Sequence, residues 1–566
     1  MNNKIILTGL VAAMTAASCS LLDREPHVLT PETFYRSEKE VLYGLTGVYG
    51  ALNNEEVYGN YYSLMISNAD DLCYYNRPVN GSYVYWYNHS ADEPNVYQAW
   101  SMLYAGIKNA NEFMHFVDGS EFDPQKTYYN EARFLRAYYH FLLAQAWGDV
   151  PLRTERTLSP DDTQKAATPQ AQVLVWCIEE MEAVAAAFPD SMDNAPSRLT
   201  RTTMEGILAR VCLFTAGESV AGVDSRHYYG RAAYWAKEVI ADGRHRLNPD
   251  YADVFINMIA DRYDRTWYES MWEADFLGDR SDASSWSNGR IGDLIGLQNA
   301  GMDANYAEWN ANFSYGMYNG SLKLWDLYYL ADRTPGEERT LTDARLAWNL
   351  PPYNWAGRKK SGSATAYDYR PGYDKTPYFY NNKPSFAADP DTDTGEAVCR
   401  RNAGKWRRET AYEGHKNAKM LYTGINFPIL RYADVLLMYA EAVNEYAGAP
   451  DELARECVRQ VRSRAGIATD ERQTASYDAF RTLVRNERAR ELAFEGLRKW
   501  DLIRWGEFVA AMNGYGDQAA DERWIRDDTS QLAEEIGANV RPKHVYLPIP
   551  SKELSVNKLL KQNPLW

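Results

Sequence analysis

Apolar residues recur at helical spacing along two long stretches of the first third of the chain, and this periodicity limits the possible folds most. Residues 98–117 carry such a stripe from Trp100 onward, and residues 129–147 carry a second one. Gly148 directly follows the second stripe and Pro151 comes shortly after, as is typical just beyond the end of a helix. The pattern predicts two long, neighbouring helices.

Further helical stretches follow, mostly in pairs. They are predicted at 171–187 with 204–216, at 228–241, and at 432–446 with 453–464. The first pair partly matches the tetratricopeptide pattern through Trp100, Leu103, Ala137, Phe141 and Pro151, although it is longer than one standard repeat. Because a helix cannot bury its stripe alone, we expect elaborated helix pairs that stack around one continuous core. The predicted fold class is mainly α.

The middle of the chain differs from both ends. From about residue 248 to 426 it is rich in Gly, Asn, Pro and Tyr. Long irregular segments in a compact protein are often functional loops, but they are also consistent with solvated insertions that bind nothing. We therefore expect one domain over 19–566, with a helical part at about 30–247, a loop-rich middle at about 248–426 and a helical part at about 427–566.

The first residues resemble an export signal. Lys4 precedes an uncharged apolar run over 5–17, which is too short for the roughly 20 residues of a membrane-spanning helix. Ala17, Ser18 and Cys19 then resemble a bacterial lipobox, in which the cysteine is acylated. We interpret 1–18 as a lipoprotein signal peptide and Cys19 as the lipid anchor; the alternative is an ordinary signal peptide with a chance cysteine.

The amino-acid composition limits the classes of binding partner. The formal net charge of −16 would repel a phosphate backbone, which argues against nucleic acid. The six cysteines include no CxxC pair, and most are expected to be buried small apolar residues. The chain has 42 Tyr and 17 Trp but only 17 Phe. Because Tyr and Trp combine an apolar face with a polar edge, this balance favours a binding surface that is partly exposed to water.

A series of short motifs runs nearly from end to end of the chain behind Cys19. They are PETFY at 31–35, GLTGVY at 44–49, NAN at 109–111, EARFLRA at 131–137, GDVP at 148–151, PILRYAD at 428–434, LLMYAEA at 436–442, VRSRAG at 461–466, ERARELAFEG at 487–496, DLIRW at 501–505, LPIP at 547–550 and QNP at 562–564. In this order the motifs resemble those of the SusD/RagB family of outer-membrane lipoproteins from glycan-utilisation systems.

This resemblance implies an α-rich single domain of tetratricopeptide-like helix pairs with a ligand face built from loops. It also implies a lipid-anchored protein, exposed at the cell surface on the outer membrane. Such a protein captures an oligosaccharide and acts as a lid on a SusC-like, TonB-dependent β-barrel transporter. Some family members bind peptides instead, so a RagB-like peptide-capturing role stays open.

Three carboxylates invite an enzymatic alternative, a surface glycoside hydrolase. Glu487, Glu491 and Glu495 are spaced i, i+4, which places two carboxyl groups within the roughly 5–9.5 Å that glycosidases use. However, arginines alternate with them and lie on the preceding helix, so an ion-pair network is the simpler interpretation. HExxH, GxSxG and P-loop motifs are absent from the sequence. We therefore predict a protein without catalytic residues or a cofactor.

One stretch resembles a calcium-binding loop. Asp389, Asp391 and Asp393 alternate, but Gly395 comes one position late for an EF-hand and Arg400 replaces its final glutamate. An exposed acidic loop is favoured, so no metal site is predicted, with calcium kept as the alternative.

The glycan-binding candidates are aromatic, because sugars stack their C–H faces on Trp and Tyr while Asn, Asp and Arg bind their hydroxyl groups. Two segments offer both residue types, at about 70–88 and 286–318. The predicted contacts are Trp86 and Asn88 first, with Tyr83 and Arg77, and then Trp286 and Trp309 with Tyr306. Each aromatic residue is also consistent with simple packing.

The sugar's identity and linkage stay open. The overall negative charge disfavours uronic or sulfated ligands, but a local arginine such as Arg77 would favour them.

Overall fold

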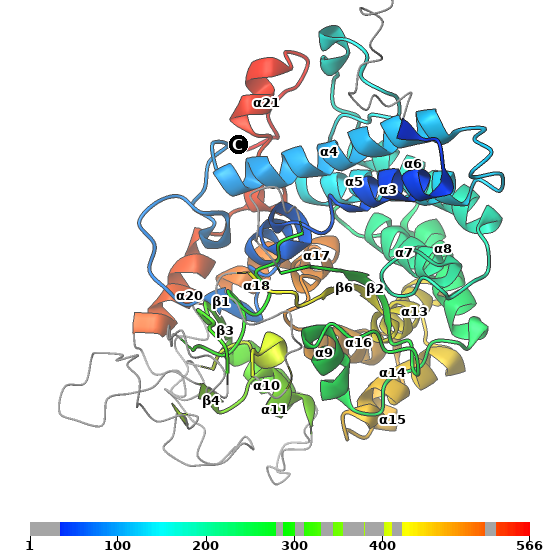
Figure 1. The fold of residues 1–566 in the computed structure, drawn as a ribbon. Helices are drawn as coiled ribbons and strands as arrows, with labels where there is room; N and C mark the ends of the chain where they lie inside the picture. The colour runs from blue at the N-terminus through cyan, green and yellow to red at the C-terminus, as the bar shows by residue number, and fades with distance from the viewer. Residues whose placement is uncertain are drawn as a thin grey trace, which may run out of the picture.

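The computed structural model describes residues 34–278, 287–299, 311–329, 343–354, 378–379, 401–409, 412, 422–515 and 528–566. Its fold is mainly α, as predicted (Figure 1). The α-helices are α3 (Glu38–Tyr49), α4 (Pro94–Val117), α5 (Thr127–Trp147), α6 (Gln170–Ala187), α7 (Arg201–Thr215), α8 (Ser225–Asp242), α9 (Tyr251–Ile259), α10 (Leu322–Tyr329), α11 (Arg345–Asn349), α13 (Tyr432–Ala447), α14 (Glu452–Arg464), α15 (Glu471–Thr474), α16 (Tyr477–Glu491), α17 (Arg498–Arg504), α18 (Phe508–Asn513), α20 (Asp528–Asn539) and α21 (Ser551–Val556).

Other elements are short. The π-helical turns are η1 (Glu55–Gly59) and η2 (Tyr61–Ile66), and the 3₁₀ turns are η3 (Val84–Trp86), η4 (Pro160–Thr163), η6 (Gly404–Trp406) and η8 (Pro542–Val545). The strands are β1 (Cys73–Tyr75), β2 (Ser270–Ala274), β3 (Tyr318–Gly320), β4 (Tyr353–Asn354), β5 (Tyr378–Phe379) and β6 (Phe427–Arg431). They form three antiparallel pairs: β1 with β3, β2 with β6, and β4 with β5.

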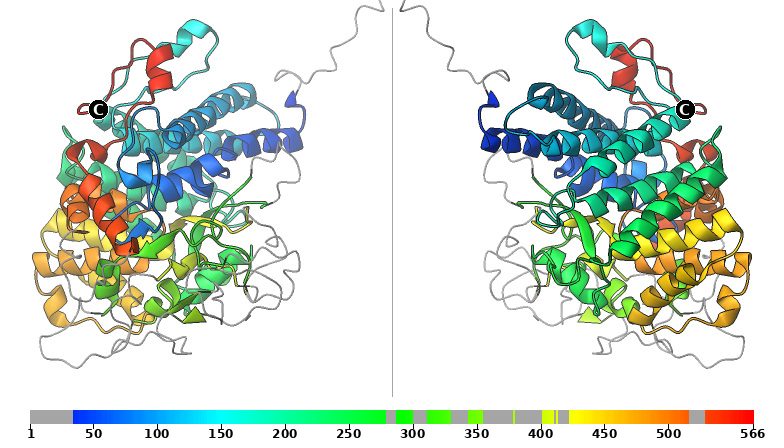
Figure 2. Two further views of the ribbon diagram at one scale, coloured as in Figure 1. Left: turned by 90° about the vertical axis from the view of Figure 1, so that its left-hand side faces the viewer. Right: turned by 90° about the vertical axis from the view of Figure 1, so that its right-hand side faces the viewer.

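The predicted helix pairs are present and stack in order. Each helix from α4 to α8 packs on the next one, and α8 then packs on α13, which in turn contacts α14 and α16. Figure 2 shows this succession, in which the helices of the first part lie beside those of the last part. The stack therefore continues across the loop-rich middle of the chain, which leaves the stack after α8 and returns to it at α13.

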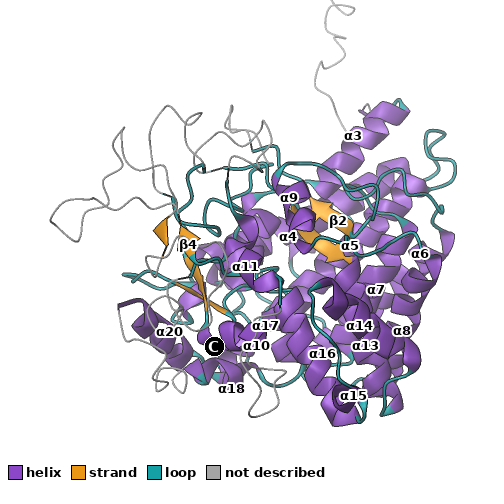
Figure 3. Ribbon diagram, turned by 90° about the horizontal axis from the view of Figure 1, so that it is seen from below, coloured by secondary structure: helices purple, strands orange, loops and turns teal. Residues whose placement is uncertain are grey.

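Figure 3 shows the helices from α6 to α8 and from α13 to α16 together on one side of the molecule, whereas β4, α18 and α20 lie on the other.

Helix α5 packs between α4 and α6 and also contacts α3 and α7. Every residue from Phe134 to Trp147 is buried, which explains why its apolar stripe is wider than that of a surface helix. Gly148 ends the helix at a φ of 76°, a backbone conformation that glycine adopts without strain. The predicted end of this helix is thereby confirmed.

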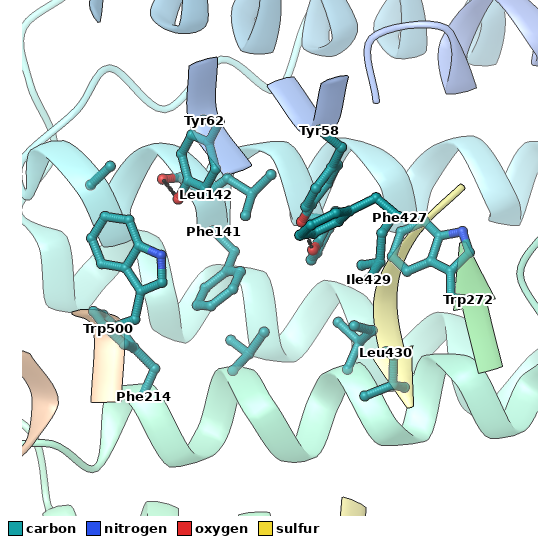
Figure 4. Close-up of a cluster of buried hydrophobic side chains, with 14 of the residues drawn as sticks. Tyr58, Tyr62, Phe141, Leu142, Phe214, Trp272, Phe427, Ile429, Leu430 and Trp500 are labelled. Carbon is teal, nitrogen blue, oxygen red and sulfur yellow. Dashed lines mark hydrogen bonds between the residues drawn. The ribbon is translucent and has the colours of Figure 1, made fainter. Parts of the chain in front are cut away.

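The core connects distant parts of the chain (Figure 4). Tyr58 and Tyr62 from the two π-helical turns meet side chains of α5, α7, α17 and the β2–β6 pair. Trp272 of β2 is fully buried and its ring lies 5.0 Å from that of Tyr138. The ring of Tyr62 stacks on Trp500 at 5.9 Å. One continuous core thus joins the first helices, the middle and the last helices.

The predicted ion-pair network is present and lies inside the protein. It joins the loop-rich middle to α14, α16 and β6. Its cations are Arg345, Lys405, Arg431, Arg462, Arg464 and Arg490, and its anions are Glu269, Asp343, Glu487, Glu491 and Glu495. One feature differs from the prediction: α16 ends at Glu491, so Glu495 lies in the turn beyond the helix. The chain turns there because Phe494 and Gly496 adopt positive φ angles.

The network keeps its carboxylates ionised despite their burial. Burial by itself would raise the pKa of Glu487, but Arg345, Arg490 and Arg462 lower it to about 2. Glu491 is surrounded by Arg464, Arg431 and Arg345, and these guanidinium groups hold its pKa far below the usual range. A buried carboxylate of this kind is stable only while its partners remain in place.

Replacing Gly106 of α4 by alanine should destabilise the protein. A Cβ atom at this position would lie 2.7 Å from the Tyr139 ring and 2.9 Å from the Cβ of Ala51. We expect the free energy of unfolding to fall by about 1–3 kcal/mol, because overpacking outweighs the better helix propensity of alanine. Gly47→Ala on α3 is the control, because nothing lies within 4 Å of the Cβ position there. Its better helix propensity should raise the free energy of unfolding by about 0.5–1 kcal/mol. Urea unfolding measures both; equal stability of the two variants would contradict the packing argument.

Glu487→Gln should remove about 3–5 kcal/mol from the free energy of unfolding at pH 7, because three guanidinium groups lose a charged partner. A depressed folded-state pKa contributes stability that is complete above the ordinary value of 4.5 and is lost as pH falls towards about 2. Unfolding titrations between pH 5 and 2 should therefore show a smaller loss of stability in the variant than in the wild type.

Glu452→Gln is the control for this experiment. The Glu452 side chain is 77% exposed and its ion pairs lie at the surface, so we expect a change of at most about 1 kcal/mol. A comparable loss in both variants would contradict a special role of the buried network.

Candidate ligand-binding site

Strands β1 and β3 bring together the two segments that the sequence predicts as binding loops. Their antiparallel register pairs Cys73 with Gly320 and Tyr75 with Tyr318. Beyond the pair, the Asn76 amide group donates to the carbonyl of Gly316 and to the side chain of Asn319, both at 2.7 Å. Parts of the chain separated by more than 200 residues thus form one junction, visible at β1 and β3 in Figure 1.

Tyrosine rings cover this junction. The Tyr83 ring stacks on Tyr85 at 5.3 Å, and Tyr85 lies 4.5 Å from Tyr75. Tyr75 in turn meets the edge of Tyr318 at 5.9 Å. Tyr85 and Tyr318 are buried, whereas Tyr75 and Tyr83 are half-buried and keep part of their rings open to solvent. The cluster therefore presents aromatic surface on a rigid base.

Arg77 is held against the second segment. Its Nη2 donates to the carbonyl oxygen of Tyr315 at 2.7 Å, and its guanidinium carbon lies 5.4 Å from the centre of the Tyr315 ring. Arg77 and Tyr315 are both half-buried. The charge also acts on Tyr75: burial raises the pKa of that tyrosine, and Arg77 opposes the rise. Arg77 and the tyrosines consequently form one surface.

Trp86 and Asn88 have supporting positions. Trp86, which we expected to present a stacking face, is only 6% exposed, and its carbonyl oxygen accepts from Asn539 at 3.0 Å. Asn88 is exposed, but its amide group closes the loop by accepting from the Tyr83 backbone at 2.8 Å and donating to the Gly81 carbonyl at 3.0 Å. Both residues hold the loop that carries Tyr83.

The acidic pair at the start of the first segment is also structural. Asp71 is buried and accepts from Arg498 Nε at 2.8 Å and Nη2 at 2.9 Å, and Lys323 binds the same carboxylate. Asp70 is buried beside it, and burial together with the charge of Asp71 raises the pKa of Asp70 to about 8. Asp71 thus anchors β1 to α10 and α17, while the Asp70 carboxyl group accepts from the backbone N–H groups of Leu72 and Cys73.

The structure adds a neighbouring group that the sequence analysis missed. Arg290 pairs with Asp293 at 2.7 Å and lies 3.8 Å from Glu55, and its backbone N–H donates to the carbonyl of Gly59. Burial, reinforced by Glu55 and Glu56, raises the pKa of the half-buried Tyr61 to about 12. The carbonyl oxygen of Asp293 accepts a hydrogen bond from the Tyr315 backbone N–H at 2.7 Å, so this group borders the tyrosine junction. No sequence spacing signals a contact between residues so far apart.

Several candidates lie outside the described residues. These are Cys19, Trp286, Tyr306, Trp309 and the acidic stretch from Asp389 to Asp393.

Within the described part of the chain, no group of three His, Cys, Asp or Glu residues is arranged to hold a metal ion. The helices of that part also include none that is long and apolar enough to cross a membrane. Cys73, Cys177, Cys212 and Cys457 are free and buried, as expected.

The three carboxylates of the enzymatic alternative are unsuited to acid catalysis. A glycosidase needs one carboxylic acid that stays protonated near neutral pH, so its pKa must be raised. Glu487 has a pKa lowered to about 2, and the pKa of Glu491 is lower still. All three side chains are buried in ion pairs. They stabilise the fold instead of facing a substrate.

A cavity of about 900 Å³ lies between α3 and α4, away from the tyrosines. Its wall consists mainly of small and apolar residues such as Ala51, Met102, Ala105 and Leu277. A sugar needs hydrogen-bonding partners and flat ring surfaces in the same place, and the tyrosine junction offers both. We therefore take the junction, and not the cavity, as the candidate binding site.

Comparisons with known proteins agree with the fold. The model of the SusD family matches residues 268–566, and a second model, described as starch-binding and associating with the outer membrane, matches residues 21–213. SusD-like protein P25 of Formosa agariphila is 26% identical over 96% of this chain and 95% of its own. A SusD homologue from Bacteroides thetaiotaomicron superposes with a TM-score of 0.76 at 22% identity, covering 95% and 98% of the two chains. A laminarin-binding SusD-like protein reaches 0.63 at 21% identity, covering 94% and 100%.

The first of these family models spans more than half of the chain, and the helix stack and the short strand pairs form one continuous fold. This chain therefore belongs to the SusD family.

Proposed function

We propose that this protein is a non-enzymatic, cell-surface lipoprotein that captures oligosaccharides at the tyrosine junction. One observation carries the proposal: β1 and β3 place Tyr75, Tyr83 and Tyr315, all partly open to solvent, on one surface with Arg77. These are the two kinds of group that sugar recognition needs, flat rings for the C–H faces and planar donors for the hydroxyl groups.

The base of the site favours binding without large rearrangement. Tyr85 and Tyr318 are buried beneath the open rings, and Asn76 and Arg77 are already bound to the opposite segment. Preorganised groups lose little conformational freedom when a ligand binds. In this proposal Tyr83, Tyr75, Tyr315 and Arg77 contact the sugar, while Trp86 and Asn88 position the loop.

We also propose Trp286, Tyr306 and Trp309 as further stacking residues, on the grounds of their sequence context.

The known ligand classes of structural neighbours support a glycan ligand. One neighbour binds laminarin, and others are surface glycan-binding proteins from two Bacteroides species. Family membership and the N-terminal motif further support attachment to the outer membrane through a lipid on Cys19. In the same proposal the captured oligosaccharide is delivered to a SusC-like, TonB-dependent transporter.

The double variant Tyr83→Ala, Tyr315→Ala should bind oligosaccharides about tenfold more weakly or worse, which corresponds to about 1.4 kcal/mol. The loss is expected because two stacking faces disappear while the buried base of the site remains. Titration calorimetry of the protein without its signal peptide, against neutral and acidic oligosaccharides and against peptides, measures the effect.

Tyr234→Ala on α8 is the matched control, because Tyr234 is 46% exposed and lies on the helix stack away from β1 and β3 (Figure 1). It should leave sugar binding unchanged. Binding of peptides alone, or a double variant that binds sugars like the wild type, would contradict the proposed site.

Cys19→Ala should release the protein from the membrane fraction, because the acyl chains would have no attachment point and each buried methylene contributes about 0.8 kcal/mol. Fractionation of expressing cells, with mass spectrometry of the mature N-terminus, measures this. An unlipidated wild-type protein would contradict the anchor.

A further inference from the structure

Arg77 differs from the arginines around it in having no carboxylate partner. Among the described residues, its guanidinium group makes one hydrogen bond, to the carbonyl oxygen of Tyr315, and lies against the ring of the same residue. The neighbouring Arg290 is paired with Asp293, and Arg498 beneath the site is paired with Asp71. Within the described part of the chain, the positive charge of Arg77 is therefore not paired with a carboxylate.

The hydrogen-bonding capacity of Arg77 is mostly unused. Nη2 is the one nitrogen of this side chain that donates within the described structure, which leaves Nε and Nη1 for a ligand. A guanidinium group presents its N–H groups in a planar fork that fits a carboxylate or sulfate with two parallel hydrogen bonds. The hydrogen bond and the ring contact with Tyr315 keep the guanidinium group beside that half-buried tyrosine.

The charged groups around Arg77 do not cancel its attraction for an anionic ligand. Asp293 and Glu55 are both paired with Arg290. Glu93, which acts on Tyr85, is buried and accepts a hydrogen bond from the Asn95 amide group. The chain as a whole carries a net charge of −16, but charges beyond about 8–10 Å are screened at physiological ionic strength. A ligand anion bound at Arg77 would thus meet a local positive charge and not the average charge of the protein.

We propose that Arg77 makes the tyrosine junction selective for acidic glycans, whose uronate carboxylate or sulfate ester it binds while the sugar rings stack on Tyr83 and Tyr315. This inference rests on the proposed function and names the ligand class of the same site. The alternative is that Arg77 donates only to sugar hydroxyl groups, as in the proposed function alone, which would favour neither acidic nor neutral glycans.

The test is a set of matched ligands on a glycan array and in calorimetry. Each uronate oligosaccharide is paired with its carboxyl-reduced form, and each sulfated oligosaccharide with its desulfated form. The wild type should bind the acidic member about tenfold more tightly or better, a difference that increasing salt reduces. Arg77→Gln should lose this preference while retaining the weaker binding of the neutral member, and Arg77→Lys should keep part of it.

Arg246→Gln is the matched control. Arg246 also binds a backbone carbonyl, that of Thr266, and lies over an aromatic ring, Trp267, but it belongs to a different region of the protein. This variant should leave the preference intact, and thermal unfolding should show both Gln variants folded.

The outcomes separate the two proposals. Equal binding of acidic and neutral members, or an equal loss of both in Arg77→Gln, overturns the acidic selectivity while the glycan-binding function stands. If the protein binds no glycan of either kind, both the proposed function and this inference are overturned. A preference for uronates alone or sulfates alone identifies which anion the site accepts.

Discussion

The buried charge network is the interaction on which the rest of this structure depends. The Glu491 carboxylate forms ion pairs with Arg345 from the loop-rich middle, Arg431 from β6 and Arg464 from α14. One carboxylate thus joins three distant parts of the chain. Removing charges from water costs several kcal/mol for each ion, and only well-placed partners offset that cost. The middle of the chain must therefore return to one position on the helix stack, because any other position would leave buried charges unpaired.

The candidate site depends on the same principle at a smaller scale. Asp71 lies immediately before β1, and its ion pairs with Arg498 and Lys323 tie that strand to α17 and α10. With β1 held in this way, β3 can pair with it and bring Tyr315 and Tyr318 against Tyr75 and Arg77. The open tyrosine rings thus belong to loops, but their base belongs to the core. This is how a loop-built surface achieves the rigidity that binding requires.

Sequence reasoning was accurate wherever the signal was local. The stripe around Trp100 and the Gly148 end of α5 depend on neighbours within a few residues, and the helices appear where they were predicted. The alternation of glutamate and arginine around Glu487 was sufficient to predict ion pairing instead of catalysis. Sequence also located the two segments that form the candidate site. Within them it ranked Trp86 first, although the structure buries this ring, because burial of a loop residue depends on elements such as Asn539 that come much later in the chain.

Short-range periodicity and ordered motifs were sufficient to predict the mainly α class, the stacking helix pairs, the ion pairing and the family resemblance. The three-dimensional arrangement was needed to show that α8 meets α13, that Tyr75 pairs with Tyr318, and that Arg77 has no carboxylate partner among the described residues. These features are contacts between residues far apart in the chain. They form because apolar surfaces must be buried and buried charges must be paired at the same time, and no local sequence pattern encodes that condition.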